Sequence, residues 1–136
     1  MFETILFPID ASPEAQQAAT KAIEIAEHHH SQLVLLSVVE AVDSPHGATH
    51  PEQTSPAAVA QLLEQAKHLF AQRGVNTQAI EREGQPAFVI CDVADEVSAD
   101  LIVMGCRGVG LTSEGQSASV SNRVINLAPC PVMVVP

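Results

Sequence analysis

The chain has 136 residues, 46% of them hydrophobic, and a formal net charge of -10. That length is typical of one domain, and that apolar content excludes an intrinsically disordered chain. Only 6 residues are Lys or Arg, so the basic surface that nucleic-acid binding requires is missing. No apolar run approaches the ~20 residues of a membrane span. We therefore expect one domain over residues 1–136, with no nucleic-acid or membrane partner.

The N-terminus and the cysteines bear on the cellular compartment. Residues 1–9 contain an acidic residue within a strand-like run and do not form a signal peptide, so the cytoplasm is the expected compartment. The spacing of Cys91, Cys106 and Cys130 fits neither a zinc site nor a CxxC redox pair, and favours reduced thiols. We expect Cys91 and Cys130 in the core. Cys106 is either a passive small residue or a redox-sensitive thiol.

In chain order, the first predicted elements are a strand and a helix. Residues 2–9 are apolar and β-rich and predict a buried strand. A turn follows, with Ser12 as the N-cap and Pro13 at the first position of the helix. Small residues recur at helical spacing and let this helix lie close to a sheet: Ala15, Ala18, Ala19, Ala22 and Ala26.

The middle of the chain predicts two further strands around a helix. Leu33–Val39 is a continuous apolar run and predicts a second buried strand. Residues 41–56 are rich in Asp, Ser, Pro, His and Gly and predict a mobile surface loop. Residues 59–70 predict a helix that ends near Gly74. Residues 77–83 alternate more weakly and predict a strand at the edge of a sheet.

The last third predicts two helices and two strands. A third helix begins at Pro86. Residues 101–104 predict a short buried strand, which leads directly into three glycines within residues 105–110. A fourth helix follows, with four residues facing inward: Val120, Val124, Leu127 and Ala128. Residues 132–135 predict the final strand.

The order of these elements predicts an α/β fold. Strands alternate with helices, and the strong strands are continuously apolar, which indicates an open, five-stranded, mainly parallel sheet with helices on both faces. In such folds ligands bind at the carboxyl ends of strands, where the strand order reverses. Asp10 follows the first strand and residues 105–110 follow the fourth. If these strands are neighbours, both features line one crevice.

Residues 105–121 carry the chemistry of the predicted site. Gly105 and Gly108 let backbone N–H groups approach a ligand closely. Ser119, Ser121 and the positive end of the following helix supply further donors. Neither a Walker A motif nor a GxGxxG motif after the first strand is present.

Five segments of the chain together resemble the universal stress proteins, in particular their ATP-binding subgroup. They are Ile5-Leu6-Phe7-Pro8-Ile9-Asp10-Ala11-Ser12, Ser37-Val38-Val39-Glu40, Gly84-Gln85-Pro86, Asp100-Leu101-Ile102-Val103-Met104-Gly105 and Ala128-Pro129-Cys130-Pro131-Val132. The likeness runs from end to end. It implies the three-layer α/β/α architecture of the adenine-nucleotide alpha-hydrolase-like type, with strand order 3-2-1-4-5.

The resemblance also implies a nucleotide site. The family motif is Gly, two residues, Gly, nine residues, Gly, then Ser or Thr, and Ala118 stands in place of the third glycine. Asp10 would bind the ribose and adenine side, the Val38 backbone would read the adenine edge, and Gly105 would approach the ribose. The remaining motif residues would surround the phosphates. The full candidate set is Pro8, Ile9, Asp10, Val38, Met104, Gly105, Arg107, Gly108, Ala118, Ser119, Val120 and Ser121. The implied ligand is ATP, ADP or AMP, with Mg²⁺ bridging the phosphates and no protein ligand to the metal.

Three functions remain open from the sequence. The first is a nucleotide-binding stress-response regulator or sensor with little or no catalysis, because no general base lies beside an activated nucleophile. The second is a nucleotide-free dimeric interaction module with an unidentified protein partner. The third is an adenylating enzyme, although Asp10-Ala11-Ser12-Pro13 lacks the Ser-Gly-Gly-rich loop of such enzymes. The apolar strand at residues 132–135 has a free edge that requires a partner, and the resemblance implies dimerisation through this strand, so we expect a homodimer.

Overall fold

The computed structural model describes residues 2–9, 13–39, 56–105 and 116–136, and we describe no side chain for residues 13–16, 56–60, 62 and 116–119. Strands and helices alternate along these segments: β1 (Thr4–Pro8), α1 (Pro13–His29), β2 (Gln32–Val39), α2 (Pro56–Gln72), β3 (Asn76–Glu83), α3 (Pro86–Glu96), β4 (Leu101–Gly105), α4 (Gln116–Leu127) and β5 (Val132–Val135). The mobile surface loop predicted at residues 41–56 lies outside the described residues, apart from Pro56, which already belongs to α2.

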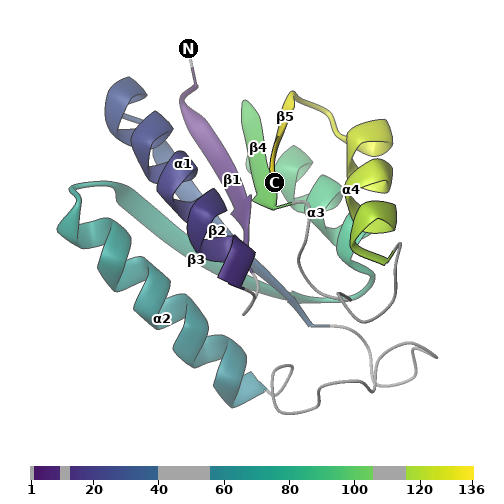
Figure 1. Cartoon of the computed structure of the whole chain (residues 1–136), viewed down its shortest axis with the longest axis horizontal. Coiled ribbons are helices and arrows are strands. Elements are labelled where there is room, and N and C mark those ends of the chain that lie inside the picture. The colour runs from purple at the N-terminus through teal and green to yellow at the C-terminus, as the bar shows by residue number, and fades with distance from the viewer. Residues whose placement is uncertain (1, 10–12, 40–55, 106–115) are drawn as a thin grey trace.

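The five strands form one parallel sheet in the order β3-β2-β1-β4-β5 (Figure 1). The predicted strand order is confirmed, and every described strand pair is parallel rather than only most of them. β1, β2 and β4 occupy the interior of the sheet and are apolar along their length because helices cover both faces. β3 lies at one edge, as its weaker alternation predicted, and β5 lies at the other.

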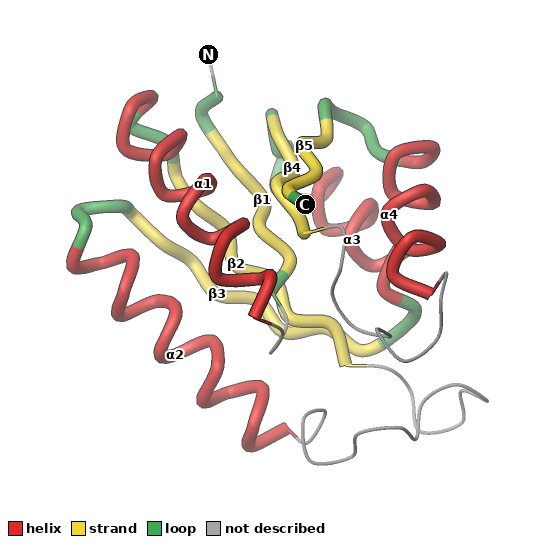
Figure 2. Tube along the Cα trace, in the orientation of Figure 1, coloured by secondary structure: helices red, strands yellow, loops and turns green. Residues whose placement is uncertain are grey.

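The sheet separates two hydrophobic cores. Figure 2 shows the sheet in yellow with the helices around it in red. Successive side chains of a strand point to opposite faces, so each buried strand contributes to both cores. On one face α1 and α2 cover these side chains: Ile5, Phe7, Leu33, Leu35, Leu101 and Val103. On the other face α3 and α4 cover a second set: Leu6, Val34, Leu36, Ile102 and Met104.

The small residues of α1 face the sheet, as their spacing predicted. Ala18, Ala22 and Ala26 recur every four residues and are almost fully buried, while Ala19 is half-buried. With only a methyl group at each of these positions, α1 lies close to the strands. The structure does not describe the side chain of Ala15.

The turns around β3 begin and end as the sequence predicted. α2 ends before Gly74, whose φ of 76° lies in the left-handed region that favours glycine. Gly84 precedes α3 with a φ of 147°, and a Cβ there would lie only 2.8 Å from Cγ2 of Val89. Glycine is therefore required at position 84, and α3 begins at Pro86 as expected.

One prediction for α4 is wrong. Val124 is fully buried, but Leu127 is 50% exposed rather than inward-facing. Leu127 is the last residue of α4, on the side of the sheet that ends with the edge strand β5, so the sheet does not continue beneath it. Val120 and Ala128 are half-buried against the second core.

Cys91 and Cys130 pack against the second core, where we expected core positions, and are half-buried there. Sγ of Cys91 lies 4.0 Å from the carbonyl oxygen of Val124. Burial is the main cause that raises the pKa of both thiols, and the neighbouring Asp92 and Asp100 carboxylates raise the pKa of Cys91 and Cys130 respectively. Cys106 lies outside the described residues.

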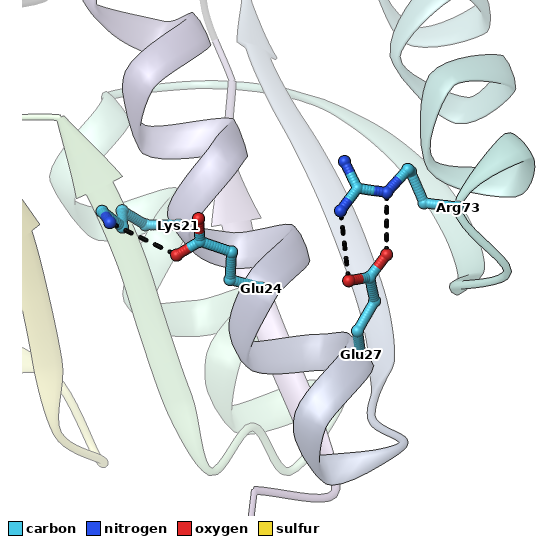
Figure 3. Close-up of polar contacts among 4 residues, drawn as sticks. All are labelled: Lys21, Glu24, Glu27 and Arg73. Atoms are coloured by element: carbon cyan, nitrogen blue, oxygen red, sulfur yellow. Dashed lines mark hydrogen bonds and ion pairs between the residues drawn. The ribbon is translucent and has the colours of Figure 1, made fainter.

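Two ion pairs involve side chains of α1 (Figure 3). The guanidinium of Arg73, just after α2, donates to both carboxylate oxygens of Glu27, at 2.9 and 3.2 Å. Lys21 pairs with Glu24 at 3.2 Å within α1. The bidentate pair joins the ends of α1 and α2, whereas the Lys21 pair is exposed and contributes little.

Asp100 fixes the start of β1. Its Oδ2 accepts hydrogen bonds from the backbone N–H groups of Glu3 and Thr4, both at 3.0 Å. We expect Asp100→Ala to lower the free energy of unfolding by about 1–3 kcal/mol, because both N–H groups lose a charged acceptor. Urea unfolding followed by circular dichroism measures this change. Asp95→Ala, which removes an exposed carboxylate from α3, is the control, and an equal effect of both substitutions would contradict the assignment.

Candidate functional site

The carboxyl ends of β1 and β4 form the point where the strand order reverses. From β1 the chain proceeds to β2 and β3 on one side, and then returns to β4 and β5 on the other. β1 pairs with β2 up to Pro8, and β4 pairs with β5 up to Gly105. The register between β1 and β4 contains only the pairs Ile5–Leu101 and Leu6–Ile102. The last residues of these two neighbouring strands are therefore not paired with each other.

Apolar side chains of the candidate set gather on one face at this point. Met104 is buried in the core under α3 and α4, and Val38 and Val120 pack against the same core. Pro8 follows Leu6 by two residues and so lies on the same face, half-buried. Ile9 differs, because its side chain packs against the opposite core and its N–H donates to the carbonyl of Leu36. Successive side chains of a strand alternate between the two faces of the sheet, and this alternation is the sequence signal that places Pro8 and Ile9 on opposite faces.

Polar groups border these apolar side chains. Ser121 is buried, with 6% of its surface exposed, and its hydroxyl has no hydrogen-bond partner among the described residues. Gly105 ends β4 and pairs with Val135. The described residues at these strand ends thus combine apolar side chains packed against one core, backbone groups and a buried hydroxyl.

The start of α4 settles the conformation at position 118. Ala118 and Ser119 lie within the first turns of α4, which begins at Gln116. An alanine in a helix needs no positive φ, so the replacement of the third glycine costs the backbone nothing there. The other predicted site residues, Asp10, Arg107 and Gly108, lie outside the described residues.

The described residues also bear on metal sites and membrane spans. Within residues 2–9, 13–39, 56–105 and 116–136, no three His, Cys, Asp or Glu side chains form a group that could hold a metal ion. In the same part of the chain, none of the helices combines the length and the apolar character needed to cross a bilayer.

The model of the Usp family, described as the universal stress protein family, matches residues 1–136. The chain belongs to this family. The match spans every residue, as the end-to-end resemblance predicted.

Individual universal stress proteins agree with this assignment. One from Synechocystis sp. is 59% identical over 138 residues, which cover 100% of this chain and 87% of the relative. The structure of UspA from Lactobacillus plantarum superimposes with a TM-score of 0.83 at 30% identity, covering 99% of this chain and 98% of the other. An Arabidopsis thaliana family member with AMP bound gives a TM-score of 0.75 at 25% identity, over 98% of this chain and 90% of that one.

Proposed function

We propose that this universal stress protein binds an adenine nucleotide at the carboxyl ends of β1 and β4 and acts as a stress-response regulator or sensor. The observation that carries the proposal is the convergence of Pro8, Val38, Met104 and Val120 on one face, where the sheet reverses its order. An adenine ring buries its apolar faces against such side chains, while backbone groups can bond its polar edge.

The phosphates fit the beginning of α4. A helix N-terminus presents unpaired N–H groups and a positive dipole end, and Ala118 and Ser119 lie in this part of α4. The Arabidopsis relative with AMP bound supports an adenine nucleotide as the ligand. We propose ATP, ADP or AMP here, with Mg²⁺ bridging the phosphates when more than one is present.

The experiment that tests nucleotide binding has two parts. The purified protein is denatured and any released nucleotide is identified by mass spectrometry. The stripped protein is then titrated calorimetrically with AMP, ADP and ATP, with and without Mg²⁺. We expect saturable binding of at least one nucleotide. No released nucleotide together with no heat at millimolar ligand would refute the proposal.

Little or no catalysis is part of the same proposal. The described site residues carry no titratable side chain (Pro8, Ile9, Val38, Met104, Gly105, Val120 and Ser121). We expect ATP turnover well below ~1 per second, the low end of typical enzyme rates. Faster turnover that is lost on Asp10→Ala would favour an adenylating enzyme instead.

The cytoplasm is the compartment that we propose. Cys91 and Cys130 are free thiols in the described part of the chain, which fits a reducing environment. Cell fractionation tests this, and recovery of the protein in a membrane or secreted fraction would contradict it.

A homodimer through β5 is the basis of a second candidate function, the interaction module. β5 is an apolar edge strand with only four residues, and two large apolar side chains, Leu127 at the end of α4 and Met133 in β5, are 50% and 38% exposed. Because the N–H of Ile102 donates to the carbonyl of Pro131, Val134 directs its backbone N–H away from β4. A second copy of β5 can pair with this edge.

We expect Val134→Pro to weaken the dimer at least ~10-fold, because it removes an outward N–H and leaves the pairing with β4 intact. Val134→Ala keeps that N–H and is the matched control for the lost side-chain volume. Light scattering at micromolar concentrations gives the mass of each variant. A monomeric wild-type protein, or a Val134→Pro dimer as stable as the Val134→Ala dimer, would overturn the β5 interface.

A further inference from the structure

The short pairing between β1 and β4 has a cause in the sequence. Within a parallel strand, successive residues direct their backbone N–H and C=O groups to alternate neighbours. The N–H of Ile9 donates to Leu36 in β2, at 2.8 Å, so the nitrogen of Pro8 faces β4. Proline has no N–H to donate.

The group on β4 that would receive this hydrogen bond can be identified. The N–H of Ile102 donates to Pro131, before β5, so Ile102 faces β5 and Val103 faces β1. The register continues from the pair Leu6–Ile102, and its next step would need residue 8 to donate to the carbonyl of Val103. That step is absent from the pairing, although β1 extends to Pro8 and β4 to Gly105.

We propose that Pro8 is a positioning residue for the nucleotide, because it ends the β1–β4 ladder and leaves the carbonyl of Val103 without the donor that another residue at position 8 would supply. The carbonyl of Val103 is then free to accept from a ligand donor, such as a ribose hydroxyl or the adenine amino group. This inference rests on the proposed function. The role that it assigns to Pro8 comes from the missing N–H and is separate from any apolar contact between the proline ring and the ligand.

The position of the break supports the proposal. Met104, which belongs to the apolar face of the candidate site, is the last residue but one of β4, so the break lies beside that face. On the other side of β1, pairing with β2 continues through Pro8, so the strand itself remains regular there. Pro8 therefore removes pairing with one neighbour only, at the location where a ligand would enter.

The test restores the missing donor. Pro8→Ala and Pro8→Val each add an N–H at position 8, and valine also favours strand conformation. In the nucleotide-free variants we expect the residue-8 amide to exchange its hydrogen at least ~10-fold more slowly than an amide without a hydrogen bond, because it donates to the carbonyl of Val103. We also expect the dissociation constant for AMP to rise about 10-fold, since the carbonyl of Val103 is then occupied by the residue-8 N–H. Nuclear magnetic resonance and calorimetry give the two readouts.

Pro131→Ala is the matched control, because it removes a proline ring just before β5, at the amino-terminal ends of the strands, and its AMP affinity should equal that of the wild type. An unprotected residue-8 amide in both variants, or unchanged AMP affinity in both, would overturn the role of Pro8. If the wild-type protein binds no AMP, ADP or ATP, the proposed function fails. In that case protection of the residue-8 amide still decides whether Pro8 ends the ladder.

Discussion

Replacing Phe70 with alanine is expected to lower the free energy of unfolding by about 3–5 kcal/mol. Phe70 is fully buried in α2, and its ring packs edge-on against Phe7 of β1, with the ring centroids 6.3 Å apart and the planes at 73°. Alanine would leave a cavity between α2 and the sheet. A loss of this size is a large part of the roughly 5–15 kcal/mol that stabilises a typical domain.

Urea unfolding followed by far-ultraviolet circular dichroism measures this loss, because the chain has no Trp or Tyr to report by fluorescence. Leu69→Ala is the matched control, since Leu69 is the neighbouring residue on α2 and is 48% exposed. We expect it to change the unfolding free energy by no more than about 0.5 kcal/mol. Similar effects of the two substitutions would contradict the packing described for α2.

Replacing Val120 with glutamate is expected to weaken AMP binding about 100-fold, which corresponds to about 2.8 kcal/mol. Val120 is half-buried on α4, packed against the core that contains Met104. A carboxylate at this position would interrupt the apolar surface for the adenine ring and would repel the phosphate. The dissociation constant is measured by calorimetry on protein whose fold has been checked by circular dichroism.

Asn122→Glu controls for the added charge, because Asn122 is exposed on the same helix. We expect its AMP affinity to stay within about threefold of the wild type, since a solvated charge is screened by salt. If Val120→Glu also binds AMP within threefold, the face formed by α4 and β4 is not the ligand site. Val120→Ala separates the loss of side-chain volume from the effect of the charge.

The helices and strands could be predicted because the signals that define them are local in the sequence. Continuous apolar runs at Leu33–Val39 and residues 101–104 identified buried parallel strands, and alanines four residues apart identified the inner side of α1. Gly74 and Pro86 set the end of one helix and the start of another, since their backbone preferences are local. The strand order came from the family resemblance.

The errors and omissions concern the surroundings of residues rather than their own preferences. Leu127 is apolar and spaced like an inward residue, but its burial depends on whether the sheet extends beneath the last turn of α4. The separation of Pro8 from Ile9 onto opposite faces, and the hydroxyl of Ser121 without a partner, required the register of the strands and the packing of α4. Asp10, Arg107 and Gly108 lie outside the described residues and stay predictions.

The two-pair junction between β1 and β4 also has a mechanical meaning. β1 and β2 are joined by five residue pairs and β2 and β3 by eight, so the β1–β4 junction is the narrowest seam of the sheet. A shearing force across the sheet would concentrate there, and α1, which contacts both β1 and β4, is the element that spans the seam. A ligand held between the two strand ends would cross-link β1 to β4. An occupied site would therefore make the sheet stiffer between its β3-β2-β1 part and its β4-β5 part.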